Sequence, residues 1–177
     1  MPTLFDIIKQ SAVIADVQEN PKLIATIHDP IEALQFAAIA RFPIGLKFIK
    51  QPSQAVKLHA VKTYSDALVY INNPSQKLIL EAVTAFPMSI SNVVNPSKKL
   101  QMIAVRHTPG AVALITNPCA DVQMLAYKLD PYTATKIKNP CPAIKLILLQ
   151  LEKEKEKNTR YWAHVNHRAS TVKKKRK

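Results

Sequence analysis

The stretch NPSQKLILEAVTAFPMSISNVVNP, residues 73–96, decides the fold, because it begins and ends with the same Asn-Pro pair. Prolines recur every 22 residues on either side of it, at Pro30, Pro52, Pro74, Pro96, Pro118 and Pro140. A second series has the same period and is interrupted only by Ser65: Pro21, Pro43, Pro87, Pro109 and Pro131. Eleven of the 13 prolines therefore occupy two positions of a 22-residue repeat, and self-similarity at such a period is typical of helical-repeat proteins.

The apolar residues keep the same period. With Pro30 as position 1 of a unit, position 5 is apolar throughout: Leu34, Val56, Leu78, Leu100, Val122 and Ile144. Position 9 is alanine in all but the last unit: Ala38, Ala60, Ala82, Ala104, Ala126 and Leu148. Positions 10, 17 and 20 are mostly apolar as well. Separations of three to five residues between apolar positions indicate helices.

The prolines predict where these helices begin. Proline is tolerated at the first position of a helix, whose N–H has no partner within the helix, and it is costly in the interior. Asp29, Gln51 or an asparagine precedes each proline of the first series, and Asn or Asp is a favoured N-cap. We therefore predict that each unit is a helix of about three turns, a tight corner, and a helix of about two turns that begins at the second proline.

Helices of this length are marginal when isolated in water, so the units are expected to stack. Position 16 holds only small residues, which would let neighbouring helices approach closely: Gly45, Ala67, Ser89, Ala111 and Thr133. The sequence predicts an all-α fold, a right-handed α-solenoid of six to seven helical hairpins over residues 1–150, with units beginning at residues 8, 30, 52, 74, 96, 118 and 140. Residues 1–7 are expected to cover the first unit, and residues 151–177 to form a charged helix extension and a basic tail.

Parts of the repeat resemble a known family. The resemblance lies in Leu58-His-Ala-Val-Lys62, followed by Ala67-Leu-Val-Tyr-Ile71, and in Leu80-Glu-Ala-Val-Thr84. These segments resemble the tandem α-helical hairpins of domain of unknown function 4116, which occurs in bacteriophages, large DNA viruses and bacteria. The resemblance spans residues 8–150; it implies a helical-repeat fold and a viral or phage source, and it assigns no functional residue. The regular Asn-Pro corners depart from the family pattern.

The composition narrows the partners and the compartment. Lysine and arginine exceed aspartate and glutamate by 13, and the isoelectric point is near 9.8, which favours nucleic acid, an anionic membrane surface or an acidic protein as a partner. No run approaches the roughly 18 apolar residues of a membrane span, and we expect a soluble protein without a membrane partner. Two cysteines and no leading signal segment are typical of a reducing compartment. We expect the chain in the host cytoplasm, in a virion, or in the nucleus of a eukaryotic host.

One face of the first helices collects cations. Positions 4 and 11 are seven residues apart and therefore share a helix face away from the apolar positions; they include Lys62, Lys77, Lys99, Arg106 and Lys128. Successive units would align these side chains as a ridge that matches a phosphate backbone or an acidic protein surface. The alternative is structural, because cations near helix C-termini interact favourably with the helix dipole and lysines keep surfaces soluble. Several alanines and Asp121 interrupt the ridge.

The C-terminal tail carries the larger share of the charge. After residue 150, ten Lys and Arg against three Glu supply +7 of the net +13. The candidate binding residues in this segment are Arg160, Arg168, Lys173, Lys174, Lys175, Arg176 and Lys177. Clustered cations bind polyanions by counterion release, aromatic side chains such as Tyr161 and Trp162 stack on bases, and the final run also fits a nuclear-import signal. The alternatives are a disordered solubilising tail, and an aromatic pair that folds back over the last unit.

No pattern points to catalysis, a metal or a cofactor. Cys119 and Cys141 occupy position 2 of successive units, too far apart for a disulfide. His164 and His167 make an incomplete zinc site, and two glycines leave no room for a Gly-rich phosphate loop. The sequence therefore predicts a non-enzymatic interaction protein with no small-molecule substrate, whose solenoid surface and tail bind nucleic acid or an acidic host or viral protein. The alternative is a structural component of a virion or a large ribonucleoprotein; the oligomeric state stays open.

Overall fold

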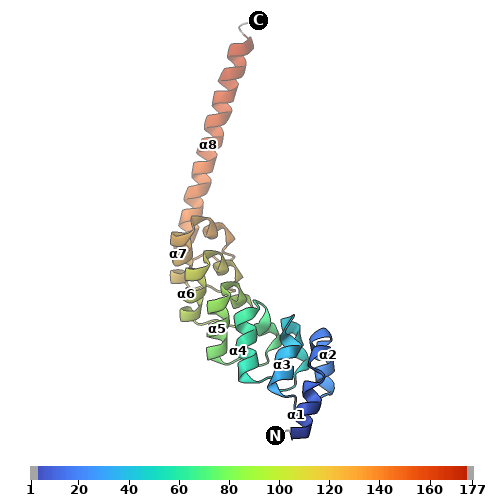
Figure 1. The fold of residues 1–177 in the computed structure, drawn as a ribbon. Helices are drawn as coiled ribbons and strands as arrows, with labels where there is room; N and C mark the ends of the chain where they lie inside the picture. Colours follow the sequence, from blue (N-terminus) through green and yellow to red (C-terminus); the bar gives the residue numbers. More distant parts are fainter. Residues whose placement is uncertain (1–3, 175–177) are drawn as a thin grey trace.

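The computed structural model describes residues 4–174, with side chains described for residues 6–161. Every regular element in this range is helical, so the predicted all-α fold is confirmed, and many short helices pack consecutively (Figure 1). The α-helices are α1 (Leu4–Ser11), α2 (Ile14–Glu19), α3 (Glu32–Ile39), α4 (Gln54–Thr63), α5 (Gln76–Ala85), α6 (Lys98–His107), α7 (Ala120–Leu129) and α8 (Pro142–Lys174). Short 3-10 helices alternate with them: η1 (Pro21–Thr26), η2 (Pro43–Phe48), η3 (Ala67–Tyr70), η4 (Pro87–Asn92), η5 (Pro109–Leu114) and η6 (Pro131–Lys136).

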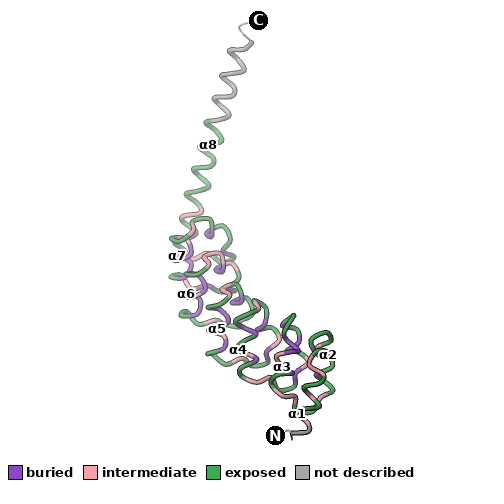
Figure 2. The backbone as a smooth tube through the Cα atoms, viewed as in Figure 1, coloured by how far each residue is buried: buried purple, intermediate pink, exposed green. Residues whose placement is uncertain are grey.

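The two kinds of helix form two rows. Each α-helix from α2 to α8 contacts the next α-helix, and each 3-10 helix from η1 to η6 contacts the next 3-10 helix. Contacts between α-helices and 3-10 helices join the rows, and the buried residues lie along the inside of the stack (Figure 2). The apolar residues at position 5 are buried in the six units from Pro30 onward, as the sequence predicted: Leu34, Val56, Leu78, Leu100, Val122 and Ile144.

Small residues at position 16 let the two rows approach closely. All five of them, from Gly45 to Thr133, are buried. At Gly45 the contact is with backbone, because a Cβ atom there would lie 1.8 Å from the carbonyl oxygen of Ala38 and 2.6 Å from its carbonyl carbon. The predicted close approach of neighbouring helices is therefore confirmed, and between α3 and η2 it leaves room for no side chain.

The predicted N-caps are wrong. Helices α4, α5 and α6 begin two residues after the proline, and their N-caps are the serines that follow it, Ser53, Ser75 and Ser97. Each serine hydroxyl accepts a hydrogen bond from the N–H three residues further on. At three of the six corners the residue before the proline turns the chain instead, with φ of 49° at Asp29, 49° at Asn73 and 50° at Asn95. Asn and Asp tolerate this left-handed conformation better than other non-glycine residues, which explains their place at these corners.

The second proline series does begin helices. Each of its five prolines is the first residue of a 3-10 helix of six residues, which at three residues per turn gives the two turns predicted. Ser65 stands in for the proline in the unit that begins at Pro52, and there η3 starts later and has only four residues. Proline presets φ for the first helical position, so its absence shortens the helix.

Glutamines join successive units, a feature that the sequence analysis missed. At position 6, the side-chain Nε2 atoms of Gln35, Gln101 and Gln123 donate to the carbonyl of the proline at position 1 of their own unit, at 2.8 or 2.9 Å. Their Oε1 atoms accept the backbone N–H at position 2 of the following unit, at 2.7 to 3.2 Å. One buried amide thus bridges two units. The same position holds Lys57 and Ile79 in two central units, and neither side chain has an acceptor atom.

The last helix departs from the repeat. A further unit was predicted from residue 140, but α8 is one continuous helix of 33 residues that projects from the stack (Figure 1). Leu149, at position 10, is 53% exposed because α8 continues where the other units form a 3-10 helix; Val61 and Val105 are buried at that position. Tyr161 is 63% exposed on the projecting helix. The expectation that the aromatic pair folds back over the last unit is therefore not met at Tyr161, and the side chain of Trp162 lies outside the described side chains.

Gly45→Ala is expected to destabilise the chain strongly, because the new methyl group would overlap the backbone of α3. Overpacking a core costs about 1–3 kcal/mol, and an overlap with backbone cannot be relieved by rotating a side chain. Gly110→Ala is the matched control, because a Cβ atom there meets nothing within 4 Å. Urea denaturation measures both variants, and equal midpoints would contradict the close packing of α3 and η2.

Gln123→Leu is expected to cost about 1–3 kcal/mol, because it leaves the Cys141 N–H without its acceptor in a buried setting. Gln123 is only 3% exposed, and it also donates to the carbonyls of Pro118 and Asn139. Gln54→Leu, on the exposed surface of α4, is the control and should change stability by no more than about 0.5 kcal/mol. Thermal and urea unfolding compare the two, and a Gln123→Leu variant as stable as the control would show that the glutamine bridge contributes nothing.

Candidate nucleic-acid interface

Four of the predicted ridge residues lie on three consecutive helices. Lys77 is on α5, Lys99 and Arg106 are on α6, and Lys128 is on α7. All four are exposed, and α5 packs on α6, which packs on α7. The structure therefore brings these four side chains onto one row of adjacent helices, and the name cationic ridge is used below for Lys77, Lys99, Arg106 and Lys128.

The fifth predicted ridge residue, Lys62 on α4, is engaged elsewhere. Its Nζ atom lies 3.1 Å from a carboxylate oxygen of Glu81 on α5. No ion pair joins the four residues of the cationic ridge to any described residue. Lys62 is therefore a poorer candidate for binding a polyanion, because its charge is already balanced.

An ion pair balances the negative charge of Asp121, the acidic residue that interrupts the ridge in the sequence. Asp121 on α7 pairs with Lys98 on α6. The hydrogen bond between them, followed by their Coulombic attraction, raises the pKa of Lys98 and lowers the pKa of Asp121. The sequence did not single out Lys98, because it occupies position 3 and not position 4 or 11. Its separation of 23 residues from Asp121, close to one repeat, could have indicated that the two side chains are neighbours in stacked units.

The positions of the ridge residues within their helices distinguish stabilisation by the helix dipole from binding of an external anion. Arg106 and Lys128 lie in the last turns of their helices, where the dipole favours a cation. Lys77 and Lys99 are each the second residue of a helix, where the dipole favours an anion and disfavours a cation. The dipole therefore explains two of the four cations and is opposed by the other two.

The predicted tail residues lie along and beyond α8. Lys153, Lys157 and Arg160 are exposed, and their spacing of four and three residues places them on one helix face. Arg168, Lys173 and Lys174 belong to the described backbone of α8, while Lys175, Arg176 and Lys177 lie outside the described residues. Since α7 contacts α8, the helix that bears the tail begins next to the last helix of the cationic ridge.

A metal site, a disulfide or a membrane-spanning helix in the described part of the chain would indicate a different function. No three His, Cys, Asp or Glu side chains gather there in a way that could hold a metal ion. Cys119 and Cys141 are free thiols, as predicted. No helix in the described range combines the length and the apolar character needed to cross a membrane.

Comparison with known proteins identifies no relative of this chain. No family model, curated protein or solved structure matches the chain. The resemblance to domain of unknown function 4116 therefore stays a prediction, and the candidate interface rests on the residues of this chain alone.

Proposed function

We propose that the chain is a non-enzymatic scaffold, a right-handed α-solenoid of six to seven helical hairpins, that binds nucleic acid through the cationic ridge and the basic C-terminal segment. The resemblance of the repeat to a phage and viral family supports a viral source. The observation that carries the proposal is the presence of Lys77 and Lys99 at the N-terminal ends of α5 and α6. Because the helix dipole opposes these charges, an external anion explains them better than helix stability does.

The spacing of the ridge suits a phosphate backbone. Packed helices lie about 8–10 Å apart, and one DNA strand places a phosphate about every 3.4 Å along the axis. Adjacent helices would therefore contact phosphates two or three nucleotides apart. Lys and Arg that contact phosphates release counterions, which supplies affinity without sequence recognition.

The ridge favours nucleic acid over an acidic protein. Protein interfaces usually contain aromatic or large apolar side chains at their centre. Positions 4 and 11 of the units carry alanine, threonine, glutamine, aspartate and cations, and no large apolar residue. These two positions offer charge to a partner, and between them on α5, α6 and α7 Leu80 is the one exposed large apolar side chain, at 39%.

Replacing all four ridge cations by glutamine is expected to weaken binding and to flatten its salt dependence. For duplex DNA the slope of log K against log salt should fall by up to about 3.6, because each phosphate contact contributes about 0.9. Lys9, Lys22, Lys138 and Lys145, which are exposed and lie outside the ridge positions, are replaced together in a control with the same change in net charge. Fluorescence anisotropy with labelled DNA and RNA measures the affinity of both variants. Equal losses of affinity would show that the ridge contributes only through the net charge of the chain.

A chain ending at Gln150 is expected to stay folded and to bind nucleic acid more weakly. Ile144, Ile147 and Leu148 make the core contacts of α8, and residues 151–161 are exposed, so truncation removes charge and spares the core. Equal melting temperatures with a loss of affinity would support a binding role for the segment. Unchanged affinity would remove residues 151–177 from the interface.

A role as a structural component is the second candidate. Leu146 and Leu149 on α8 are 59% and 53% exposed, and Leu129 on α7 is half exposed, so this end of the stack retains apolar surface for a neighbour. Sedimentation of the chain with assembled particles or ribonucleoproteins, and not as a free protein, would favour this role.

A further inference from the structure

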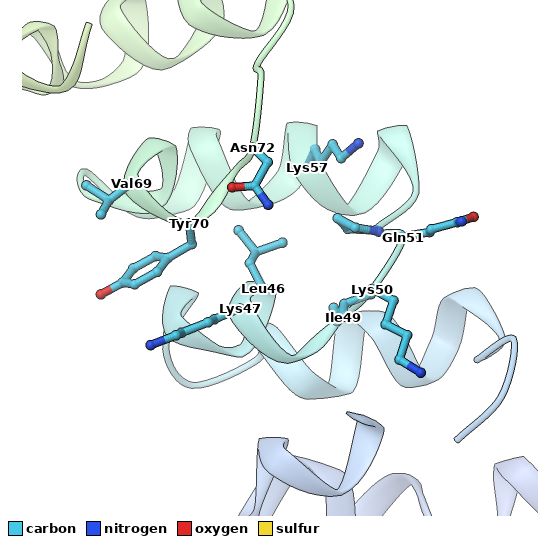
Figure 3. Close-up of a pocket in the computed structure, with 10 residues that line it drawn as sticks. Leu46, Lys47, Ile49, Lys50, Gln51, Lys57, Val69, Tyr70 and Asn72 are labelled. Atoms are coloured by element: carbon cyan, nitrogen blue, oxygen red, sulfur yellow. The ribbon is translucent and has the colours of Figure 1, made fainter. Parts of the chain in front are cut away.

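A cavity opens between η2 and η3 on the side of the corners (Figure 3). It has a volume of about 530 Å³, within the range of about 300–1,000 Å³ that is usual for small-molecule sites. Leu46 and Ile49, both buried, form its floor. Lys47, Lys50 and Lys57 contribute to its wall, and none of these lysines forms an ion pair with a described residue.

The repeat provides an internal comparison for this cavity. A smaller cavity of about 300 Å³ lies one unit earlier. Seven residues of the smaller cavity have counterparts in the larger one one full period later, and four of the counterparts change the chemistry: His28 becomes Lys50, Asp29 becomes Gln51, Gln35 becomes Lys57 and Lys50 becomes Asn72. The larger cavity therefore lacks the carboxylate of Asp29, and three lysines line it where Lys50 alone lines the smaller one.

The exchange of Gln35 for Lys57 also changes what the side chain can do. Both polar atoms of the Gln35 amide are engaged: Nε2 donates to the Pro30 carbonyl at 2.9 Å, and Oε1 accepts from the Ser53 N–H at 2.8 Å. Lysine has no acceptor atom, so Lys57 cannot bridge to Ser75 in the same way. Lys57 is half-buried, and a half-buried ammonium without an anionic partner is stabilised by an anion that enters the cavity.

We propose that this cavity binds a small ligand that carries several phosphate groups, of about the size of a nucleotide. No acidic residue lines the cavity, and Gln51, Tyr70 and Asn72 add hydrogen-bonding groups and an aromatic ring. In Figure 3 the ammonium groups of Lys47, Lys50 and Lys57 lie on different sides of Leu46, with Asn72 above it. This separation suits an extended polyphosphate better than a single phosphate ion.

The proposed cavity site does not depend on the cationic ridge. Position 6, which holds Lys57, lies two residues and thus about 200° around the helix from position 4. The site therefore faces away from the ridge. Nucleic-acid binding by the ridge and polyphosphate binding by the cavity can each fail without the other.

The test uses the full chain with sodium tripolyphosphate and ATP as probes. Isothermal titration at low salt gives the affinity, and two-dimensional amide NMR locates the site. The amide signals of Ile49, Gln51 and Asn72 should shift with both probes. Tighter binding of ATP than of tripolyphosphate would indicate that the Tyr70 ring contacts the base. Shifts confined to residues after 150 would overturn the proposal.

Lys57→Gln is the decisive variant, because three other units carry glutamine at this position and the substituted chain should fold. It should melt no lower than the natural chain and should bind both probes at least tenfold more weakly. Lys99→Gln, on the ridge, is matched in charge and should change the affinity less than twofold. Equal weakening by the two variants, or none by Lys57→Gln, would refute the site.

A labelled single-stranded oligonucleotide distinguishes the two sources of phosphate. If it shifts the amides of Ile49, Gln51 and Asn72 at lower concentration than ATP does, the cavity is part of a nucleic-acid surface and the small-ligand proposal is wrong. If it shifts ridge or α8 amides and leaves these three unchanged, the cavity is a separate site.

Discussion

The contact between successive units is the interaction on which the rest of the structure depends. Before α8, no α-helix in the described chain exceeds ten residues, and helices of this length are marginal alone in water. Each unit therefore stabilises its neighbours and is stabilised by them, through buried residues at positions 5, 9 and 16. This dependence restricts the inward positions to small or apolar side chains and leaves the outward positions free to carry charge.

Hydrogen bonds reinforce this contact unevenly along the stack. Each of Gln35, Gln101 and Gln123 joins its own unit to the unit that follows it. The two central units lack the bridge because they carry Lys57 and Ile79. The buried apolar residues also divide into two clusters, one ending at Ala82 and the other beginning at Val83, both on α5. Ile79 and Val93 pack against both clusters, so partly buried apolar contacts join the middle of the stack where the glutamine bridges are absent.

Much of the fold was predictable because its determinants recur. The period of the prolines, the apolar position 5 and the small position 16 each appear in five or six units, so chance cannot imitate them. The function of the Asn-Pro corners was not predictable in the same way. An asparagine before a helix suits both an N-cap and a left-handed turn, and only the backbone φ shows which one it is. The glutamine bridge escaped notice because it is present in some units and absent from others.

The candidate site was predictable as a set of residues and not as an arrangement. Position arithmetic placed Lys77, Lys99, Arg106 and Lys128 on one face, and all four are exposed on adjacent helices. The helices begin two residues later than predicted, which moves Lys77 and Lys99 from the fourth to the second residue of their helices, where the dipole disfavours a cation. The Lys62–Glu81 and Lys98–Asp121 pairs join different units. They depend on how the units stack, which a single repeat does not contain.

Position 6 shows how one place in a repeat can serve either stability or binding. A glutamine there turns inward, satisfies two backbone groups and leaves a smaller cavity of about 300 Å³. A lysine can donate to the carbonyl but cannot accept from the N–H of the next unit, and its charge requires solvent or an anion. The unit that carries Lys57 therefore gives up a bridge between units and lines a cavity of about 530 Å³ with cations. A local loss of this kind is most readily understood at a functional site, where a sequence departs from the pattern that stabilises the rest of the fold.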